Sequence, residues 1–288
     1  MTDNLKQSTG IRILLFLVIL LVSGLIGVAA AAFFMLMGDT GMKIGQGISS
    51  IFMFVVPPIV YYFVTRKQHQ LRDLGFRSVN KPWPLFIFAG IVVMFVSLPV
   101  TNQLTVWNEN MKLGGALQAL EDTLKAWEET AAAATEQMLN VDTIGGLLFN
   151  LVVIALIPAI GEELTFRGVL QQGLTRRINP HIAIILSSAI FSFIHFQFYG
   201  FLPRMFLGML LGYLFYTSGS LWTSMLMHFI NNGCAVVVFY LNNKGVIDVD
   251  VDHFGEAPNV WIIIAGAIVT TALIVWCWRK RKPSASKD

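Results

Sequence analysis

Long apolar runs are the feature that most restricts how this chain can fold. A hydrocarbon core about 30 Å thick is crossed by a helix of about 20 apolar residues. Eight runs of the sequence are candidates for such helices, near Ile13–Met37, Ile48–Val64, Leu85–Val100, Ile144–Arg167 with an extension beyond it, His181–Phe196, Phe201–Thr217, Leu221–Leu241 and Val260–Trp278. We therefore expect an all-α fold, a polytopic transmembrane helical bundle of about eight spans.

Composition argues against the other classes of protein. Of the 288 residues, 13% are charged and 55% are hydrophobic, whereas an average soluble domain carries about 25% charged residues. This balance argues against a water-soluble enzyme and against a disordered chain. The two cysteines, Cys234 and Cys277, lie inside apolar stretches, so we interpret them as small core residues rather than a disulfide or a metal pair.

The charges are distributed unevenly between the two sides of the predicted bundle. If both termini are cytoplasmic, 15 of the 20 basic residues fall on the inner side. This asymmetry follows the positive-inside rule and predicts cytoplasmic termini in a multi-pass protein of the cell membrane. Twelve of the 17 acidic residues fall on the outer side, in agreement. The basic tail Arg279–Lys282 directly follows an apolar run, so we expect it to contact the lipid bilayer, with no nucleic-acid partner.

Two segments depart from a plain series of straight spans. Pro57 and Pro58 interrupt the second run and predict a kink or a break there. The long loop Thr101–Thr143 carries apolar residues at helical spacing, Leu117, Leu120, Leu124 and Trp127. This spacing predicts an amphipathic helix on the outer membrane surface or capping the bundle, and a plain solvated connector is the alternative.

Ionisable and amide side chains inside apolar runs are costly and tend to mark functional sites. The fourth run contains Glu162 and Glu163, the fifth contains His195, and the seventh contains His228 and Asn232. Counted from the expected helix ends at about 1.5 Å per residue, Glu162 and His195 lie about 22 Å deep. His228 and Asn232 lie about 12–18 Å deep on the same count. We therefore expect these polar groups from three helices to converge.

Helical spacing separates the roles of the two glutamates. Glu163 and Arg167 are four residues apart and can form an ion pair, which we interpret as structural. Glu162 then faces the open side, where it could deprotonate a water molecule. His195 could hold that water or pass on its proton, and His228 and Asn232 could donate hydrogen bonds to an oxyanion.

A metal is the open alternative for this chemistry. Glu162, His195 and His228 could hold zinc with a water in the fourth position. However, the HExxH spacing is absent, and no pair of candidate ligands shows an established metal spacing. We expect no cofactor, with zinc as the possibility to be tested.

Three motifs carry a resemblance to a known family. Glu162–Arg167 reads EELTFR and has the form EExxxR, Phe191–His195 has the form FxxxH, and His228–Asn232 has the form HxxxN. In this order and on separate apolar segments, they resemble the motifs of the CAAX-protease and bacteriocin-processing family of intramembrane endopeptidases, also called the Abi family. The resemblance covers roughly residues 150–240. It divides one membrane domain, 1–288, into N-terminal spans with the outer loop (11–140), a catalytic core (144–241), and a last span with a basic tail (259–288).

The resemblance implies an all-helical membrane core that hydrolyses a peptide bond of a membrane-associated or lipidated protein or peptide. By matched position it implies Glu162 as general base, with the supporting and site residues Glu163, Arg167, Phe191, His195, His228 and Asn232. Members of the family have been described both as metalloproteases and as metal-free glutamate proteases, so the resemblance leaves the zinc question open.

Two other functions compete with proteolysis. A proton-coupled transporter would use the same groups as a relay, but it predicts related halves and a second polar cluster, and the sequence shows neither. A non-catalytic bacteriocin-immunity or membrane scaffold protein would keep the fold without the chemistry. Such a chain would tend to lose one of the four groups proposed for catalysis, and all four are present.

Overall fold

The computed structural model describes residues 9–65, 74–78, 83–249, 257 and 259–281, and these ranges contain helices and no strand. The N-terminal third holds α1 (Thr9–Met35), α2 (Gly38–Ser50), η2 (Ile51–Val55), α3 (Val56–Thr65), α4 (Trp83–Val96) and α5 (Leu98–Glu109). The loop that follows holds η4 (Gly115–Leu117) and α6 (Gln118–Leu139). The remainder holds α7 (Ile144–Asn150), η5 (Leu151–Leu156), α8 (Ile157–Glu162), η6 (Glu163–Gln171), α9 (Gln172–Thr175), α10 (Pro180–Phe193), η7 (Phe198–Gly200), α11 (Phe201–Ser218), α12 (Leu221–Asn243) and α13 (Val260–Lys280).

Six of the helical segments are long and apolar enough to cross a membrane: Gly10–Phe34, Gly38–Thr65, Ile144–Thr175, Phe198–Ser218, Leu221–Asn243 and Val260–Lys280. A seventh segment is the pair α4 and α5, which meet at a bend of 41°. The fifth expected span, His181–Phe196, is short, because α10 has 14 residues, about 21 Å of helix. The predicted all-α fold is thus confirmed, and the described residues contain six candidate membrane spans, or seven with the bent pair, in place of the eight expected.

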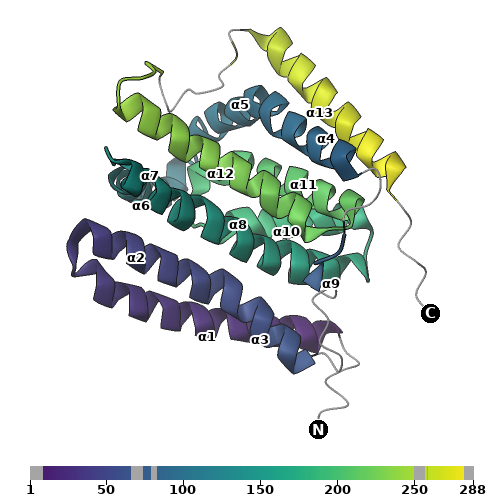
Figure 1. Cartoon of the computed structure of the whole chain (residues 1–288), viewed down its shortest axis with the longest axis horizontal. Helices are drawn as coiled ribbons and strands as arrows, with labels where there is room; N and C mark the ends of the chain where they lie inside the picture. Colours follow the sequence, from purple (N-terminus) through teal and green to yellow (C-terminus); the bar gives the residue numbers. More distant parts are fainter. Residues whose placement is uncertain (1–8, 66–73, 79–82, 250–256, 258, 282–288) are drawn as a thin grey trace.

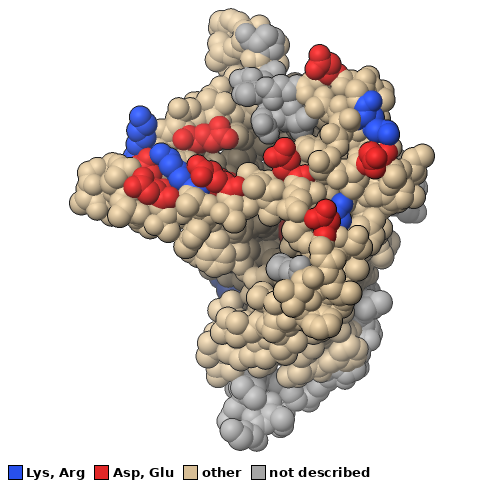
Figure 2. Space-filling model, turned by 90° about the vertical axis from the view of Figure 1, so that its left-hand side faces the viewer, with Lys and Arg blue, Asp and Glu red and all other residues tan. Residues whose placement is uncertain are grey.

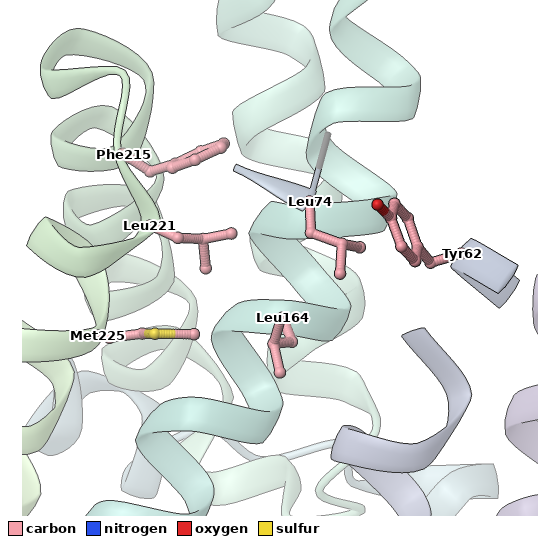
Figure 3. Close-up of a cluster of buried hydrophobic side chains, with 6 residues drawn as sticks. All are labelled: Tyr62, Leu74, Leu164, Phe215, Leu221 and Met225. Carbon is pink, nitrogen blue, oxygen red and sulfur yellow. The ribbon is translucent and has the colours of Figure 1, made fainter. Parts of the chain in front are cut away.

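The helices are arranged in layers around the segment α7–α9 (Figure 1). Helices α1, α2 and α3 form one side of the molecule, and α4, α5 and α13 form the opposite side, with α10, α11 and α12 between them. One buried apolar cluster fixes the central position of η6, and Figure 3 shows its side chains arranged around Leu74. Its members are Tyr62, Leu74, Leu164, Phe215, Leu221 and Met225. The polar residues of η6 are therefore enclosed by helices distant in the sequence.

The second span is continuous from Gly38 to Thr65. Its central turn, η2, is a π-helix, and Pro57 and Pro58 lie at the start of α3 directly after it. Proline lacks an N–H and clashes with the carbonyl four residues earlier, and the wider π turn accommodates this defect. The predicted interruption therefore takes the form of a π-helical turn rather than a break in the span.

The predicted amphipathic helix is α6, and its apolar side faces outward. Leu117, Leu120 and Trp127 are about half exposed, so no other part of the described chain covers them. Figure 2 looks onto the end of the bundle that carries α6, and acidic side chains gather on this face. An exposed apolar stripe beside charged groups is the pattern of a helix that lies at a membrane surface.

The start of α6 is anchored by a buried carboxylate, and this predicts a pH-dependent contribution to stability. Lys125 donates to Glu121 at 2.7 Å, and the N–H groups of Leu113 and Gly114 donate to its other oxygen at 2.9 and 3.1 Å. These bonds, that of Lys125 foremost, lower the pKa of Glu121 from 4.5 to about 2. Because the folded pKa is depressed, the stabilisation is present above pH 4.5 and is lost as the pH falls through about 2.

We therefore expect Glu121→Gln to melt at a lower temperature than the wild type at neutral pH. The difference between the two proteins should shrink as the pH is lowered from about 5 towards 2, and thermal unfolding in detergent across this range measures it. Glu129→Gln, on the exposed side of α6, is the control and should melt like the wild type throughout. A difference between wild type and Glu121→Gln that is independent of pH would contradict the prediction.

Candidate active site

The two adjacent glutamates lie in one continuous helix at the centre of the bundle. Glu162 is the last residue of α8 and Glu163 is the first residue of the π-helix η6. Glu163 is fully enclosed and Glu162 is 7% exposed. A π-helix of nine residues is rare, and π turns occur frequently at functional sites. The sequence thus places two carboxylates side by side where water has little access.

The predicted ion pair between Glu163 and Arg167 is confirmed. Arg167 Nη1 donates to Glu163 Oε1 at 2.5 Å, and Arg167 Nη2 donates to the carbonyl of Gly208 at 2.8 Å. A side chain at position 208 would bring a Cβ to 3.0 Å from the Cβ of Ser188, so glycine permits this close approach of α11. The guanidinium also lies over the ring of Phe191, 5.0 Å from its centre, which is within the range of a cation–π contact. The pair therefore ties η6 to α10 and α11.

His228 lies between the two carboxylates. Its Nδ1 is 3.0 Å from Glu163 Oε1, and its Nε2 is 3.7 Å from Glu162 Oε2. Because a carboxylate accepts, Nδ1 donates to Glu163, and the ring orientation is fixed by a group that is itself held by Arg167. Spacing alone assigned Glu163 to Arg167 and did not show this second bond. Glu163 therefore orients the imidazole that stands beside Glu162.

His195 lies in the turn that follows α10, two residues beyond the helix end at Phe193. Its Nδ1 is 2.8 Å from the carbonyl of Phe191. A carbonyl can only accept, so the proton is on Nδ1, and the lone pair of a neutral ring is on Nε2. The rings of His195 and His228 both pack edge-on against Phe191, with centre distances of 5.1 and 6.1 Å. Phe191 is thus the shared wall that brings the two histidines together.

Asn232 lies one turn beyond His228 on α12. Its amide nitrogen is 3.4 Å from the carbonyl of Ile154 in η5, and its amide oxygen accepts from Asn231 at 3.2 Å. The amide group of asparagine has two N–H bonds, so one remains for a ligand. The structure places Asn232 beside η5, in the span Ile144–Thr175 that also carries Glu162 and Glu163.

Taken together, these contacts place Glu162 beside His228 at the centre of the bundle, with His195 packed against the same phenylalanine as His228. Asn232 lies one helical turn beyond His228, and Glu163 and Phe191 contact the ring of His228. Such a set offers a base, a second proton acceptor and hydrogen-bond donors in a low-dielectric environment, which are the groups that hydrolysis of an acyl bond by water requires.

Comparison with known protein families finds a match in the part of the chain that contains these residues. Residues 144–234 match the family model described as type II CAAX prenyl endopeptidase Rce1-like. The chain carries an Rce1-like domain. This domain runs from α7 into α12 and contains all seven of the site residues predicted from the sequence. No curated protein and no solved structure matches the chain.

Sequence reasoning missed one polar network of the Rce1-like domain, on the segment after His195. Arg204 of α11 donates to the side chain of Gln197 at 2.9 Å, and it lies close enough to Glu162 and Glu128 to interact with both carboxylates electrostatically. The available signal is an arginine inside the apolar run Phe201–Thr217, where a charge is costly without a partner. The structure supplies that partner in Gln197, two residues from His195.

Two residues outside the Rce1-like domain form hydrogen bonds with the segment 197–202. Glu128 of α6 accepts from the N–H of Tyr199 at 3.1 Å and from the side chain of Gln197 at 3.3 Å. Asn108 of α5 donates to the carbonyl of Phe198 at 2.9 Å and accepts from the N–H of Leu202 at 2.7 Å. The outer helix α6 is therefore attached to the turn that carries His195 and is not merely a connector.

The proposed zinc ligands do not form a metal site. Among the described residues, no group of three His, Cys, Asp or Glu side chains is placed to hold a metal ion. In both histidines Nδ1 is engaged, by Glu163 in His228 and by a backbone carbonyl in His195, so Nε2 is the ring nitrogen open to a ligand. The set Glu162, His195 and His228 is not among side chains grouped closely enough for a metal ion in the described residues, and zinc stays an alternative to be tested.

Proposed function

We propose that the protein is an intramembrane endopeptidase that hydrolyses a peptide bond of a membrane-embedded or lipidated protein or peptide. The match to a type II CAAX prenyl endopeptidase family supports a membrane protease and a CAAX-type reaction. The observation that carries the mechanism is Glu162, a buried carboxylate beside an imidazole whose other nitrogen is fixed by Glu163 and Arg167.

In the proposed reaction, Glu162 removes a proton from a water molecule as its oxygen attacks the scissile carbonyl carbon. The carbonyl oxygen becomes an oxyanion, which the free N–H of Asn232 and the ring of His228 stabilise by hydrogen bonds. Collapse of the tetrahedral intermediate breaks the C–N bond, and the amine leaves with the proton that Glu162 took from the water. His195 accepts a hydrogen bond from the attacking water at Nε2.

The proposal includes the placement of the protein in the cell, with several spans in the cell membrane and both termini in the cytoplasm. The basic ends of α9 and α13 and the acidic face that carries α6 (Figure 2) support this orientation.

The experiment that tests the proposal compares membrane-protein termini in cells that carry the wild type or the Glu162→Gln variant. We expect new termini that depend on Glu162, and the purified protein in proteoliposomes should cleave peptides containing those sites. Absence of any Glu162-dependent terminus, together with a folded and membrane-inserted variant, would contradict proteolysis.

The attachment of α6 to the turn carrying His195 predicts an effect on activity far from Glu162. Glu128→Ala removes the acceptor for Tyr199 and Gln197, so the turn is released and turnover should fall about ten- to a hundredfold, as expected for misplacement of a reacting group. Glu128→Gln keeps an oxygen that accepts the N–H of Tyr199 and should recover most of the loss.

The readout is kcat and its pH profile on a membrane peptide. If Glu128 positions the turn, its loss should lower kcat and change how kcat depends on pH on the acidic side of the profile. If Glu128 affects stability alone, kcat per folded molecule should depend on pH as in the wild type. Glu129→Ala, on the exposed side of the same helix, is the matched control. Equal activity of Glu128→Ala and Glu129→Ala would contradict the role of this contact.

A further inference from the structure

A cavity of about 280 Å³ opens at the end of the bundle opposite α6. Its walls come from the start of α1, the end of α3, and the segment formed by η6 and α9. Figure 1 shows the ends of these helices on the same side of the molecule, near the N-terminus. The catalytic proposal does not use this cavity, whose lining includes none of the site residues described above.

Three arginines give the cavity its charge. Arg12, Arg176 and Arg177 line it. Guanidinium groups present several N–H donors in a planar fork that suits the paired oxygens of phosphate. The site thus favours an anion with several acceptor oxygens.

The remaining walls are apolar, and the cavity lies at the ends of membrane spans. Phe16 and Leu170 contribute apolar surface. Arg12 is near the start of the span Gly10–Phe34, and Arg176 and Arg177 directly follow the span Ile144–Thr175. Basic pockets between spans at this depth lie level with lipid head groups. An amphiphile would place its charged group on the arginines and its acyl chains along the helices.

We propose that this cavity binds a phosphate-bearing anion, with the phosphate oxygens on the guanidinium groups of Arg12, Arg176 and Arg177. The same chemistry has two sources, the phosphodiester of an anionic lipid head group or a free phosphate in solution. The apolar wall and the position at the span ends favour the lipid. Binding here is independent of the proteolytic proposal.

Two substitutions in the cavity separate its charge from its volume. Arg177→Gln removes one guanidinium from an exposed position. Gly173→Leu fills the cavity while the three arginines stay, because a Cβ at Gly173 meets no atom within 4 Å. The matched controls are Arg279→Gln, an exposed arginine outside the cavity, and Gly145→Leu, a helical glycine that also has open space around it.

The experiment measures lipid retained by the full-length protein in detergent by native mass spectrometry. The probes are phosphatidylglycerol, phosphatidylcholine and inorganic phosphate. We expect preferential retention of phosphatidylglycerol by the wild type and both controls, about fivefold weaker binding in Arg177→Gln, and loss of the preference in Gly173→Leu. Displacement of the lipid by inorganic phosphate at millimolar concentration would assign the site to free phosphate and still support the phosphate chemistry.

Two outcomes would overturn the proposal. One is retention of phosphatidylglycerol that is unchanged in both Arg177→Gln and Gly173→Leu. The other is an equal reduction in Arg177→Gln and Arg279→Gln, which would show attraction to basic surface without a site. Thermal unfolding of each variant in the absence of lipid verifies that the proteins compared are folded.

Discussion

Glu162→Gln should lower the turnover of a membrane-peptide substrate by a factor of about 10² to 10⁴, the usual contribution of a general base. The substitution keeps the shape of the side chain and removes its ability to accept a proton from water. Glu162 is only 7% exposed and its carboxylate lies 3.7 Å from Nε2 of His228, and the amide fits the same space because it has nearly the same size and shape as the carboxylate. The measurement is kcat in proteoliposomes with the wild type as reference.

Two comparisons make the result specific to the base. Glu162→Asp keeps a carboxylate but shortens its reach, so it should recover part of the activity. Glu129→Gln removes a carboxylate from an exposed face of α6 and should be fully active. If Glu162→Gln is folded by thermal unfolding and cleaves at the wild-type rate, Glu162 is not the base and the proposed mechanism is wrong.

Spacing in the sequence predicted the centre of the site because its groups are few and lie inside apolar runs. Glu163 and Arg167 are four residues apart, and this separation keeps them on one face in an α-helix and still in contact in the π-helix observed. The depth estimate for His195 and His228 brought both to one region, where they share contacts with Phe191. Zinc ligation could not be decided in the same way, because it depends on the distances between side chains of different helices.

What the sequence did not show depends on contacts between distant segments. The bonds from Glu128 to Tyr199 and Gln197 link residues about 70 positions apart, and helical periodicity contains no signal for them. Small residues are also the reason why the predicted boundaries of the second span differ from the observed ones. The segment 38–47 is rich in glycine and polar residues and lies outside the second predicted run, yet it belongs to the helix α2.

The reason is close packing against α1. A Cβ at Gly45 would lie 3.0 Å from the carbonyl oxygen of Ala31, and one at Gly27 would lie closer still to Phe52. In a membrane, small residues of this kind permit helices to approach rather than marking loops. Eight apolar runs consequently became six long helices, a bent pair and the short α10.

The largest expected effect on stability follows removal of Arg167. Arg167 and Glu163 are both almost completely buried, and the guanidinium donates to the carboxylate and to the carbonyl of Gly208. Removing one partner leaves an uncompensated buried charge, which costs about 3–5 kcal/mol. We therefore expect Arg167→Ala to yield little folded protein, measured by thermal and denaturant unfolding in detergent, whereas Arg279→Ala on the exposed end of α13 should unfold like the wild type.

A double variant separates stability from chemistry at the same pair. Arg167→Met with Glu163→Gln removes both charges, and the glutamine oxygen can still accept the proton on Nδ1 of His228. Replacing a buried ion pair by neutral groups of similar size is often close to neutral for stability, so the double variant should fold where Arg167→Ala does not. Its turnover should stay low, because a neutral amide replaces the carboxylate that orients His228 beside Glu162, and Arg167 no longer holds that side chain in place. A folded double variant with wild-type turnover would restrict Glu163 and Arg167 to helix packing, and a double variant as unstable as Arg167→Ala would show that volume and shape, rather than charge, hold η6 in place.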